Sequence, residues 1–217
     1  MRNPTRIAIF VSIMSVFLYI ANLVVYEALA VTFGITSNIQ LLLLGTTLGV
    51  LAASFVGAMI VGSYFYNLFT RTFYTLVAVW IGTFCYLFFA AVALGLVLIG
   101  NEYGIVNLPA ELVGKVLFAA AVIVSTYGVV HATKMTVSQY TVTLPHLPEA
   151  WKGKKAVFIS DLHLGQLHGP KFAAKVARFV SSLTPDIVFI GGDLYDGTQA
   201  PDPLMLAKPL TDIAAPW

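Results

Sequence analysis

Apolar residues dominate the first 133 positions of the chain, and short apolar blocks separated by polar residues follow. A membrane-spanning helix needs about 20 consecutive, mostly apolar residues. Four segments meet that requirement, so we expect helices at about 7–30, 39–62, 74–99 and 112–132. The charged side chains of this part are Arg2, Arg6, Glu27, Arg71, Glu102, Glu111 and Lys115. The pattern predicts a transmembrane domain of four helices over residues 1–133.

The first apolar segment also has features of a signal peptide, because Arg2 and Arg6 precede it and residues 28–30 resemble a cleavage site. Its apolar run is longer than the roughly 7 to 15 residues of a signal core, and further spans follow. We therefore expect it to be retained as a membrane helix. Glu27 ends this span, where headgroups and water reach it, so we interpret it as interfacial.

Positive charge predicts the orientation, since cytoplasmic flanks retain Lys and Arg. The basic residues on one side of the predicted spans are Arg2, Arg6, Arg71, Lys134, Lys152, Lys154 and Lys155. The two other connections carry Glu102, Glu111 and only one lysine, Lys115. We therefore expect a multi-pass cell-membrane protein with its N-terminus and its C-terminal domain in the cytoplasm, and the lipid bilayer as a partner.

A different pattern begins at Lys134. Alternating polar and apolar residues, then prolines and a glycine, predict a linker over 134–154 that contains an extended strand. Short apolar runs at 156–159 and 187–190 predict buried strands, and apolar residues at helical spacing predict a helix over 171–183. The expected fold class is therefore an α-helical membrane bundle followed by an α/β domain from residue 155, with parallel strands joined by a right-handed crossover.

Composition agrees with this division and excludes some functions. Only 10% of the residues are charged, against about 25% in a soluble domain. The net charge of +2 and the lack of a basic run give no indication of nucleic-acid binding. The single cysteine, Cys85, allows neither an intrachain disulfide nor a cysteine-based metal site.

Candidate chemistry lies where the two predicted strands end. Asp161 and His163 follow the first strand, and Asp193 follows the second. The carboxyl ends of neighbouring parallel strands meet at one edge of a sheet, where ligands bind. Carboxylates and an imidazole suit manganese, iron or zinc, and a shared cation relieves the repulsion between the acids.

The residues at these strand ends resemble a known family. The Asp161–His163 segment and the Gly192–Asp196 segment are similar to the D-x-H and G-D-x-x-D blocks of the calcineurin-like metallophosphoesterases. The resemblance covers residues 155–217, and the membrane half resembles the multi-span anchors of some bacterial members. It implies the start of a metallophosphoesterase sandwich, a phosphate-ester substrate and two divalent metal ions that activate water.

The resemblance also implies roles for individual residues. Asp161 and His163 would bind the first metal, and Asp193 would bridge both. Asp196 matches the second acid of its block, which implies a supporting role behind the ligands. His168 matches neither block; we interpret it as a loop histidine, with a position near the substrate as the weaker alternative.

Three further blocks of the family, G-N-H-[DE], a later histidine and G-H-x-H, do not occur in this sequence. We expect the chain to be truncated after the second block, because a sheet of two core strands leaves an edge unpaired. We therefore expect the chain as given to be catalytically incomplete, with no certain catalytic residue of its own.

The leading functional hypothesis is hydrolysis of a phosphomonoester or phosphodiester at the membrane surface, with a lipid-linked substrate as one option. One alternative is a transport or partner-binding bundle that carries a regulatory phosphoesterase-like domain. Another alternative is a noncatalytic domain.

Overall fold

The computed structural model describes residues 4–196 and 202–216, and the protein divides into two compact units. The first contains Met1–Gly57 and Leu76–Met135, and the second contains Ala58–Thr75 and Thr136–Trp217. The second unit thus includes residues 58–75, which the sequence placed with the membrane helices. Arg2 and the side chain of Arg6, both used to predict the orientation, lie outside what the structure describes.

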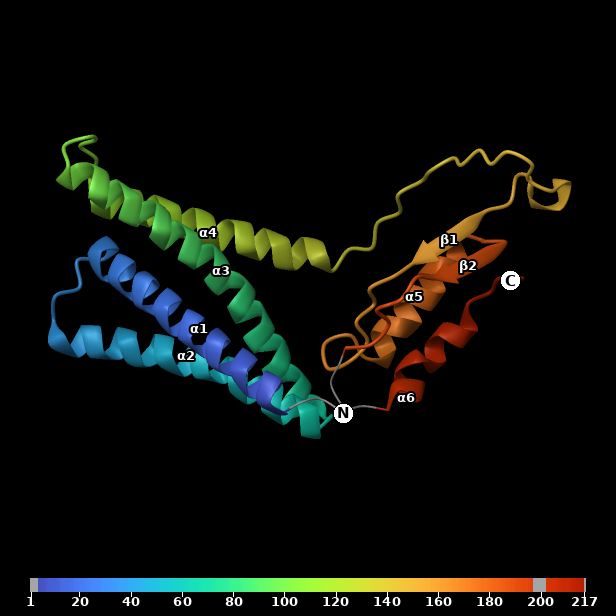
Figure 1. Cartoon of the computed structure of the whole chain (residues 1–217), viewed down its shortest axis with the longest axis horizontal. Coiled ribbons are helices and arrows are strands. Elements are labelled where there is room, and N and C mark those ends of the chain that lie inside the picture. The colour runs from blue at the N-terminus through green and yellow to red at the C-terminus, as the bar shows by residue number, and fades with distance from the viewer. Residues whose placement is uncertain (1–3, 197–201, 217) are drawn as a thin grey trace. The chain divides into compact units, whose positions relative to one another are not determined.

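Four helices of the described chain are long and apolar enough to cross a membrane. They are α1 (Pro4–Thr32), α2 (Asn38–Tyr64), α3 (Leu68–Glu102) and α4 (Ala110–Ala132) (Figure 1). Each is apolar on all sides, as expected of helices whose outer faces meet lipid rather than water. Exposed leucines and isoleucines along them, such as Ile39 at 71% and Leu42 at 71%, suit the same environment.

Two glycines end helices by adopting left-handed backbone conformations. Gly34 follows α1 with φ of 60°, and Gly104 follows α3 with φ of 67°. After α1, Ile35 N donates to Ala30 O at 2.9 Å and Gly34 N donates to Val31 O at 3.3 Å. The same pair of bonds closes α3. This arrangement satisfies helix carbonyls that would otherwise lack partners.

The core of the first unit is apolar and includes Val25 and Leu94, both 0% exposed. Helices α1 and α4 approach each other closely at Gly114, where an added Cβ would lie 2.1 Å from Thr32 Oγ1. Thr32 is fully buried, and its hydroxyl donates to Ala28 O at 2.7 Å. A side chain at Gly114 would therefore force the two helices apart.

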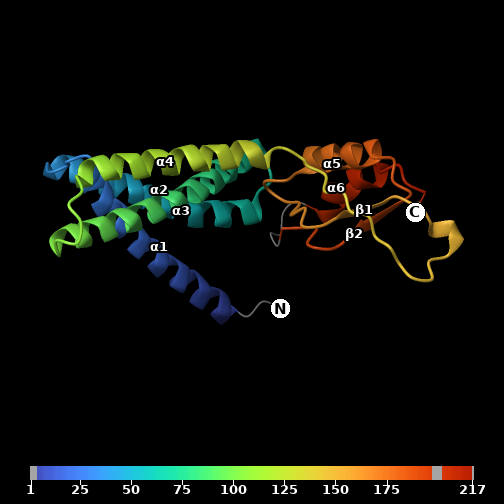
Figure 2. The same ribbon diagram turned by 90° about the horizontal axis from the view of Figure 1, so that it is seen from above.

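The second unit carries a small parallel sheet, as the sequence predicts. Strands β1 (Ala156–Ile159) and β2 (Ile187–Ile190) pair in register from Ala156 opposite Ile187 to Ile159 opposite Ile190. Helix α5 (Pro170–Ser182) connects them and buries Ala173, Val176, Ala177 and Val180. The short helix α6 (Pro203–Ala207) and the 3-10 segment η2 (Lys208–Asp212) contact α5 (Figure 2).

One feature of the described residues differs from the sequence-based expectation. Residues 134–148, all of them described, contain no strand; a 3-10 turn, η1 (Glu149–Trp151), follows them. An extended segment becomes a stable strand only when a neighbour pairs with it. In the described residues the sheet has the two strands β1 and β2, so the expected sandwich stays a prediction.

Candidate metal centre

The backbone brings the two strand ends together and keeps them together beyond the strands. Gly191 N donates to Ile159 O at 2.8 Å, where the regular pairing ends. Asp161 N then donates to Gly192 O at 3.1 Å, and His163 N donates to Asp193 O at 3.2 Å. The loops after β1 and β2 therefore lie side by side, and the position of each candidate ligand is fixed relative to the other loop.

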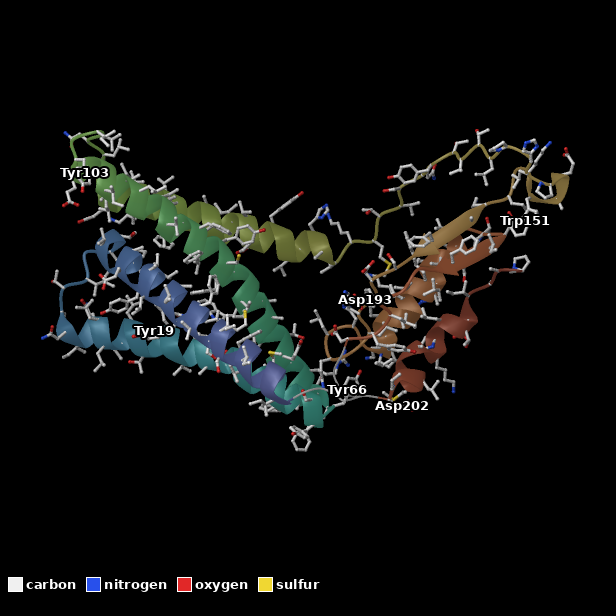
Figure 3. The ribbon with its side chains drawn as sticks, in the orientation of Figure 1. Tyr19, Tyr66, Tyr103, Trp151, Asp193 and Asp202 are labelled. Carbon is white, nitrogen blue, oxygen red and sulfur yellow. The ribbon has the colours of Figure 1, made fainter. Side chains whose placement is uncertain are left out.

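Three side chains meet at this edge of the sheet. Asp161, His163 and Asp193 each offer one ligand atom, and these atoms lie within 4.8 Å of one another. Figure 3 labels Asp193, one of the three. Donor atoms around one cation at about 2.1 Å lie at most about 4.2 Å apart, so small side-chain rotations suffice. The donor set of two carboxylates and an imidazole, all exposed to solvent, thus fits a divalent transition metal.

All three residues have left-handed backbone conformations, which residues other than glycine rarely adopt. The φ angles are 55° for Asp161, 46° for His163 and 43° for Asp193. Left-handed backbone costs about 1–2 kcal/mol per residue, although aspartate and histidine tolerate it better than most. Unfavourable conformations of this kind cluster at functional sites, where the surrounding structure imposes them. Their coincidence here indicates that the loops hold the ligands in place.

The imidazole of His163 lies between two carboxylates. Its Nε2 is 3.3 Å from Asp193 Oδ2, and its Nδ1 is 3.2 Å from Asp196 Oδ1. A metal-binding histidine usually donates its second ring N–H to a carboxylate, which fixes the tautomer and the ring orientation. With Nδ1–H directed to Asp196, Nε2 presents its lone pair toward Asp193. The supporting role of Asp196 stays a prediction, and the 3.2 Å contact is the observation from which we argue it below.

A close approach of the two loops holds Asp196 in this position. Asp196 N donates to Leu164 O at 3.0 Å. A Cβ added at Gly165 would lie 2.8 Å from Asp196 Cβ, so a larger residue at 165 would displace the carboxylate.

His168 has the contacts of a residue that supports the loop. Its Nδ1 lies 2.9 Å from Leu162 O, and a carbonyl only accepts, so Nδ1 carries the proton. Its ring stacks on Phe172 at 4.1 Å. His168 is not among the three residues whose ligand atoms converge.

Sequence reasoning missed Gln166, which is 1% exposed. Its side-chain Nε2 donates to Gly62 O and Phe65 O, both at 2.7 Å. These acceptors lie 104 and 101 residues earlier in the chain. No local pattern signals such a contact, because glutamine in a loop is ordinarily solvated.

Asp186 fixes the opposite end of the sheet and was also missed. Its carboxylate accepts from Lys154 Nζ at 2.8 Å and from the backbone N–H of Lys155 at 2.9 Å. These two hydrogen bonds lower the pKa of Asp186 below its ordinary value of 3.8, and the bond from Lys154 has the larger effect. The interaction ties the residues before β1 to the residue before β2.

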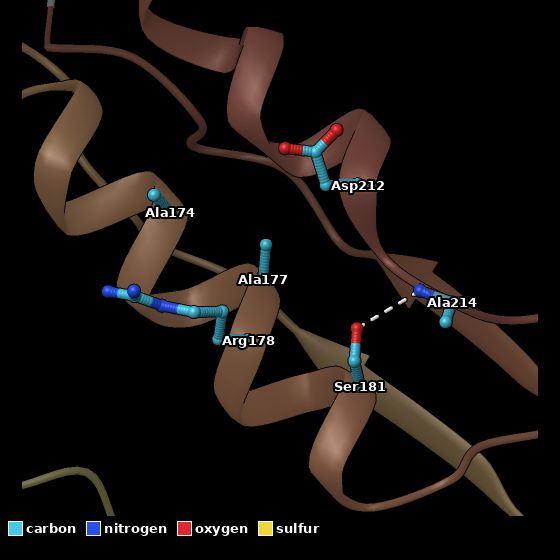
Figure 4. A pocket seen from close by; sticks show the side chains of 6 residues that line it. All are labelled: Ala174, Ala177, Arg178, Ser181, Asp212 and Ala214. Atoms are coloured by element: carbon cyan, nitrogen blue, oxygen red, sulfur yellow. Dashed lines mark hydrogen bonds between the residues drawn. The ribbon is translucent and has the colours of Figure 1, made fainter.

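A cavity of about 460 Å³ lies between α5 and η2 (Figure 4). It is lined by Ala174, Ala177, Arg178, Ser181, Asp212 and Ala214. Ser181 Oγ accepts from Ala214 N at 3.0 Å there. The cavity includes none of the three candidate ligands, and we place the chemistry at the strand ends, where the ligand atoms converge.

Comparison with known proteins points in the same direction. The chain is 33% identical over 93 residues to a protein from Danio rerio described as "Transmembrane protein with metallophosphoesterase domain". The match covers 40% of this chain and 21% of the relative, so the chain spans about a fifth of that protein's length. No protein-family model and no solved structure matches the chain. The four apolar helices and this relative identify a membrane protein with a distant, partial relation to metallophosphoesterase-like proteins.

Proposed function

We propose that the protein is a membrane-anchored, metal-dependent phosphoesterase that hydrolyses a phosphomonoester or a phosphodiester. One observation carries the proposal: ligand atoms of Asp161, His163 and Asp193 converge within 4.8 Å at the ends of two parallel strands. The partial relation to a protein with a metallophosphoesterase domain supports the same reaction class.

Each residue has a distinct task in this proposal. Asp161 and His163 would hold a first divalent cation, and Asp193 would contribute a ligand to that site and to a second one. Asp196 keeps the proton on Nδ1 of His163, so that Nε2 stays available as a ligand. Divalent cations supply a nucleophilic water and stabilise the charge on the phosphoryl oxygens. The proposal specifies a divalent transition metal such as manganese, iron or zinc, without choosing among them.

The membrane surface is the proposed place of action. The connection between α2 and α3 belongs to the same compact unit as the ligands. Apolar and aromatic side chains at the helix ends on either side of it are exposed, with Tyr64 at 73%, Leu68 at 81% and Phe69 at 75%. Aromatic residues at helix ends are typical of the membrane–water interface. A tether of this kind concentrates the site near lipid headgroups, on the cytoplasmic side in the topology that we propose.

Hydrolysis of bis(4-nitrophenyl) phosphate by the full chain in lipid nanodiscs, with and without Mn²⁺, tests the function. Asp193→Asn removes a proposed ligand, and the loss of activity should exceed the about 10–100-fold typical of residues behind the ligands. Asp202→Asn is the matched control, because Asp202 caps α6 by accepting from Leu204 N at 3.0 Å, and asparagine caps equally well. Unchanged activity in Asp193→Asn would remove the metal assignment.

A further inference from the structure

The buried amide of Gln166 caps a membrane helix from within the metal-site loop. The last carbonyls of a helix lack partners inside it, and Gly62 lies in the final turn of α2, with Phe65 just beyond. The two N–H groups of one primary amide can serve two acceptors. Gln166 Nε2 lies 2.7 Å from both carbonyl oxygens, so one side chain satisfies them together.

Arg71 strengthens the same contact from the start of α3. Its Nε donates to the backbone O of Gln166 at 3.3 Å. Its guanidinium carbon lies 5.5 Å from the centre of the Tyr66 ring, within the range of a cation–π interaction. Gly169 sits against this pair, since a Cβ there would lie 2.5 Å from Tyr66 Oη. The loop is therefore held at both position 166 and position 169.

Only two residues separate Gln166 from His163. Leu164, between them, is 0% exposed, and its N–H donates to Leu194 O at 2.8 Å in the loop after β2. The segment from His163 to Gly169 thus lies between the second ligand loop and the α2–α3 connection. A shift of Gln166 toward or away from α2 would carry His163 with it.

We propose that Gln166 is a positioning residue of the metal centre: it ties the His163 loop to the end of α2, so that this contact sets the geometry of the ligands. This inference rests on the proposed function, because it requires a metal at Asp161, His163 and Asp193. Its consequence is that metal affinity depends on a contact made by the ends of membrane helices.

A purely structural role for the buried amide predicts a different result. Loss of an amide that only stabilises the fold would reduce the number of folded sites and leave the affinity of each remaining site unchanged. Displacement of His163 would lower the metal affinity of every site and leave the number of sites unchanged. A binding titration that yields both quantities separates the two roles.

The experiment is a Mn²⁺ titration of the full chain in nanodiscs, followed by electron paramagnetic resonance of the free ion. Gln166→Met replaces the donors with a side chain of similar length, and we expect about 10-fold weaker binding at an unchanged number of sites. Gln139→Met makes the same substitution at an exposed linker position and should bind as the wild type does. Unchanged affinity in Gln166→Met, with or without a loss of sites, would overturn the inference alone. Absence of Mn²⁺ binding by the wild type would overturn the proposed function and this inference with it.

A second pair of variants covers the case in which Gln166→Met does not fold. Gly169→Ala should push Tyr66 away and weaken Mn²⁺ binding, because the added Cβ overlaps Tyr66 Oη. Tyr66→Phe removes that oxygen, which is buried and has no hydrogen-bond partner in the described part of the chain. The added Cβ still lies 3.1 Å from Arg71 Nη2 at the flexible end of that side chain, so the double variant should recover most of the wild-type affinity. Equal affinity of Gly169→Ala and wild type, or a double variant as weak as Gly169→Ala, would overturn the inference.

Discussion

Nδ1 of His163 lies 3.2 Å from Oδ1 of Asp196, a residue 33 positions further along the chain. The contact joins the loop after β1 to the loop after β2 and leaves Nε2 of the same ring beside Asp193. It explains how the second acid of the G-D-x-x-D segment can matter without binding a metal itself. In the proposed metal centre, Asp196 would act through the orientation and tautomer of the histidine.

Replacement of this supporting acid gives the first prediction. Asp196→Ala should weaken Mn²⁺ binding by about 10–100-fold, the range for residues that orient metal ligands. Asp196→Asn retains an acceptor oxygen for Nδ1–H and should lose less. Calorimetric or resonance titrations of the two variants measure the difference. Equal affinities in wild type and Asp196→Ala would show that the contact does not position His163.

The hydrogen bonds of Asp186 to Lys154 and Lys155 predict that the stability of the fold depends on pH. Folding lowers the pKa of Asp186 below 3.8. The hydrogen bonds of its carboxylate therefore stabilise the folded state fully above pH 3.8, and this stabilisation is lost as pH falls through the lowered pKa. Asp186→Asn removes the titrating group, so the stability difference between variant and wild type should shrink on acidification. Denaturant unfolding followed by fluorescence, at several pH values between neutral and acidic, measures that difference. A stability difference that stays constant through the acidic range would show that these hydrogen bonds do not stabilise the fold.

Close packing of α1 and α4 predicts unequal effects of the same substitution at two glycines. Gly114→Ala places a Cβ 2.1 Å from Thr32 Oγ1, and overpacking of this kind typically costs about 1–3 kcal/mol. Gly49 has no atom within 4 Å of its added Cβ, so Gly49→Ala is the matched control. Thermal unfolding in detergent should show a lower midpoint for Gly114→Ala only. Equal midpoints would mean that the helices separate without cost.

The topology is open to a direct labelling experiment. In a variant with Cys85→Ala, a cysteine introduced at Ser138 in the linker should react with a membrane-impermeant maleimide only after the cytoplasmic face is exposed. A cysteine at Asn107, in the connection before α4, should react in intact cells. Both positions belong to segments between or after the predicted spans. The reverse pattern of labelling would place the metal centre outside the cytoplasm.

Helices and strands that depend on the local pattern of apolar and polar residues could be predicted from the sequence. Apolar length indicated the four long helices, and two short apolar runs around a helical segment indicated the parallel strands that bring Asp161 and Asp193 to one edge. The strand predicted in the linker does not form, because strand formation depends on a partner that the local sequence cannot reveal. Gln166 gave no signal for the same reason, since its partners are Gly62 in the final turn of α2 and Phe65 just beyond that helix, 104 and 101 residues earlier in the chain.

The nitrogen coupling of bound Mn²⁺ tests the central claim most directly. Electron spin echo envelope modulation of the Mn²⁺-loaded full chain should show a directly coordinated ¹⁴N from an imidazole. This signal should disappear in His163→Gln and persist in His168→Gln, whose ring instead contacts Leu162 O and Phe172. A ¹⁴N coupling that survives in His163→Gln, or is absent from the wild type, would contradict a metal centre at Asp161, His163 and Asp193.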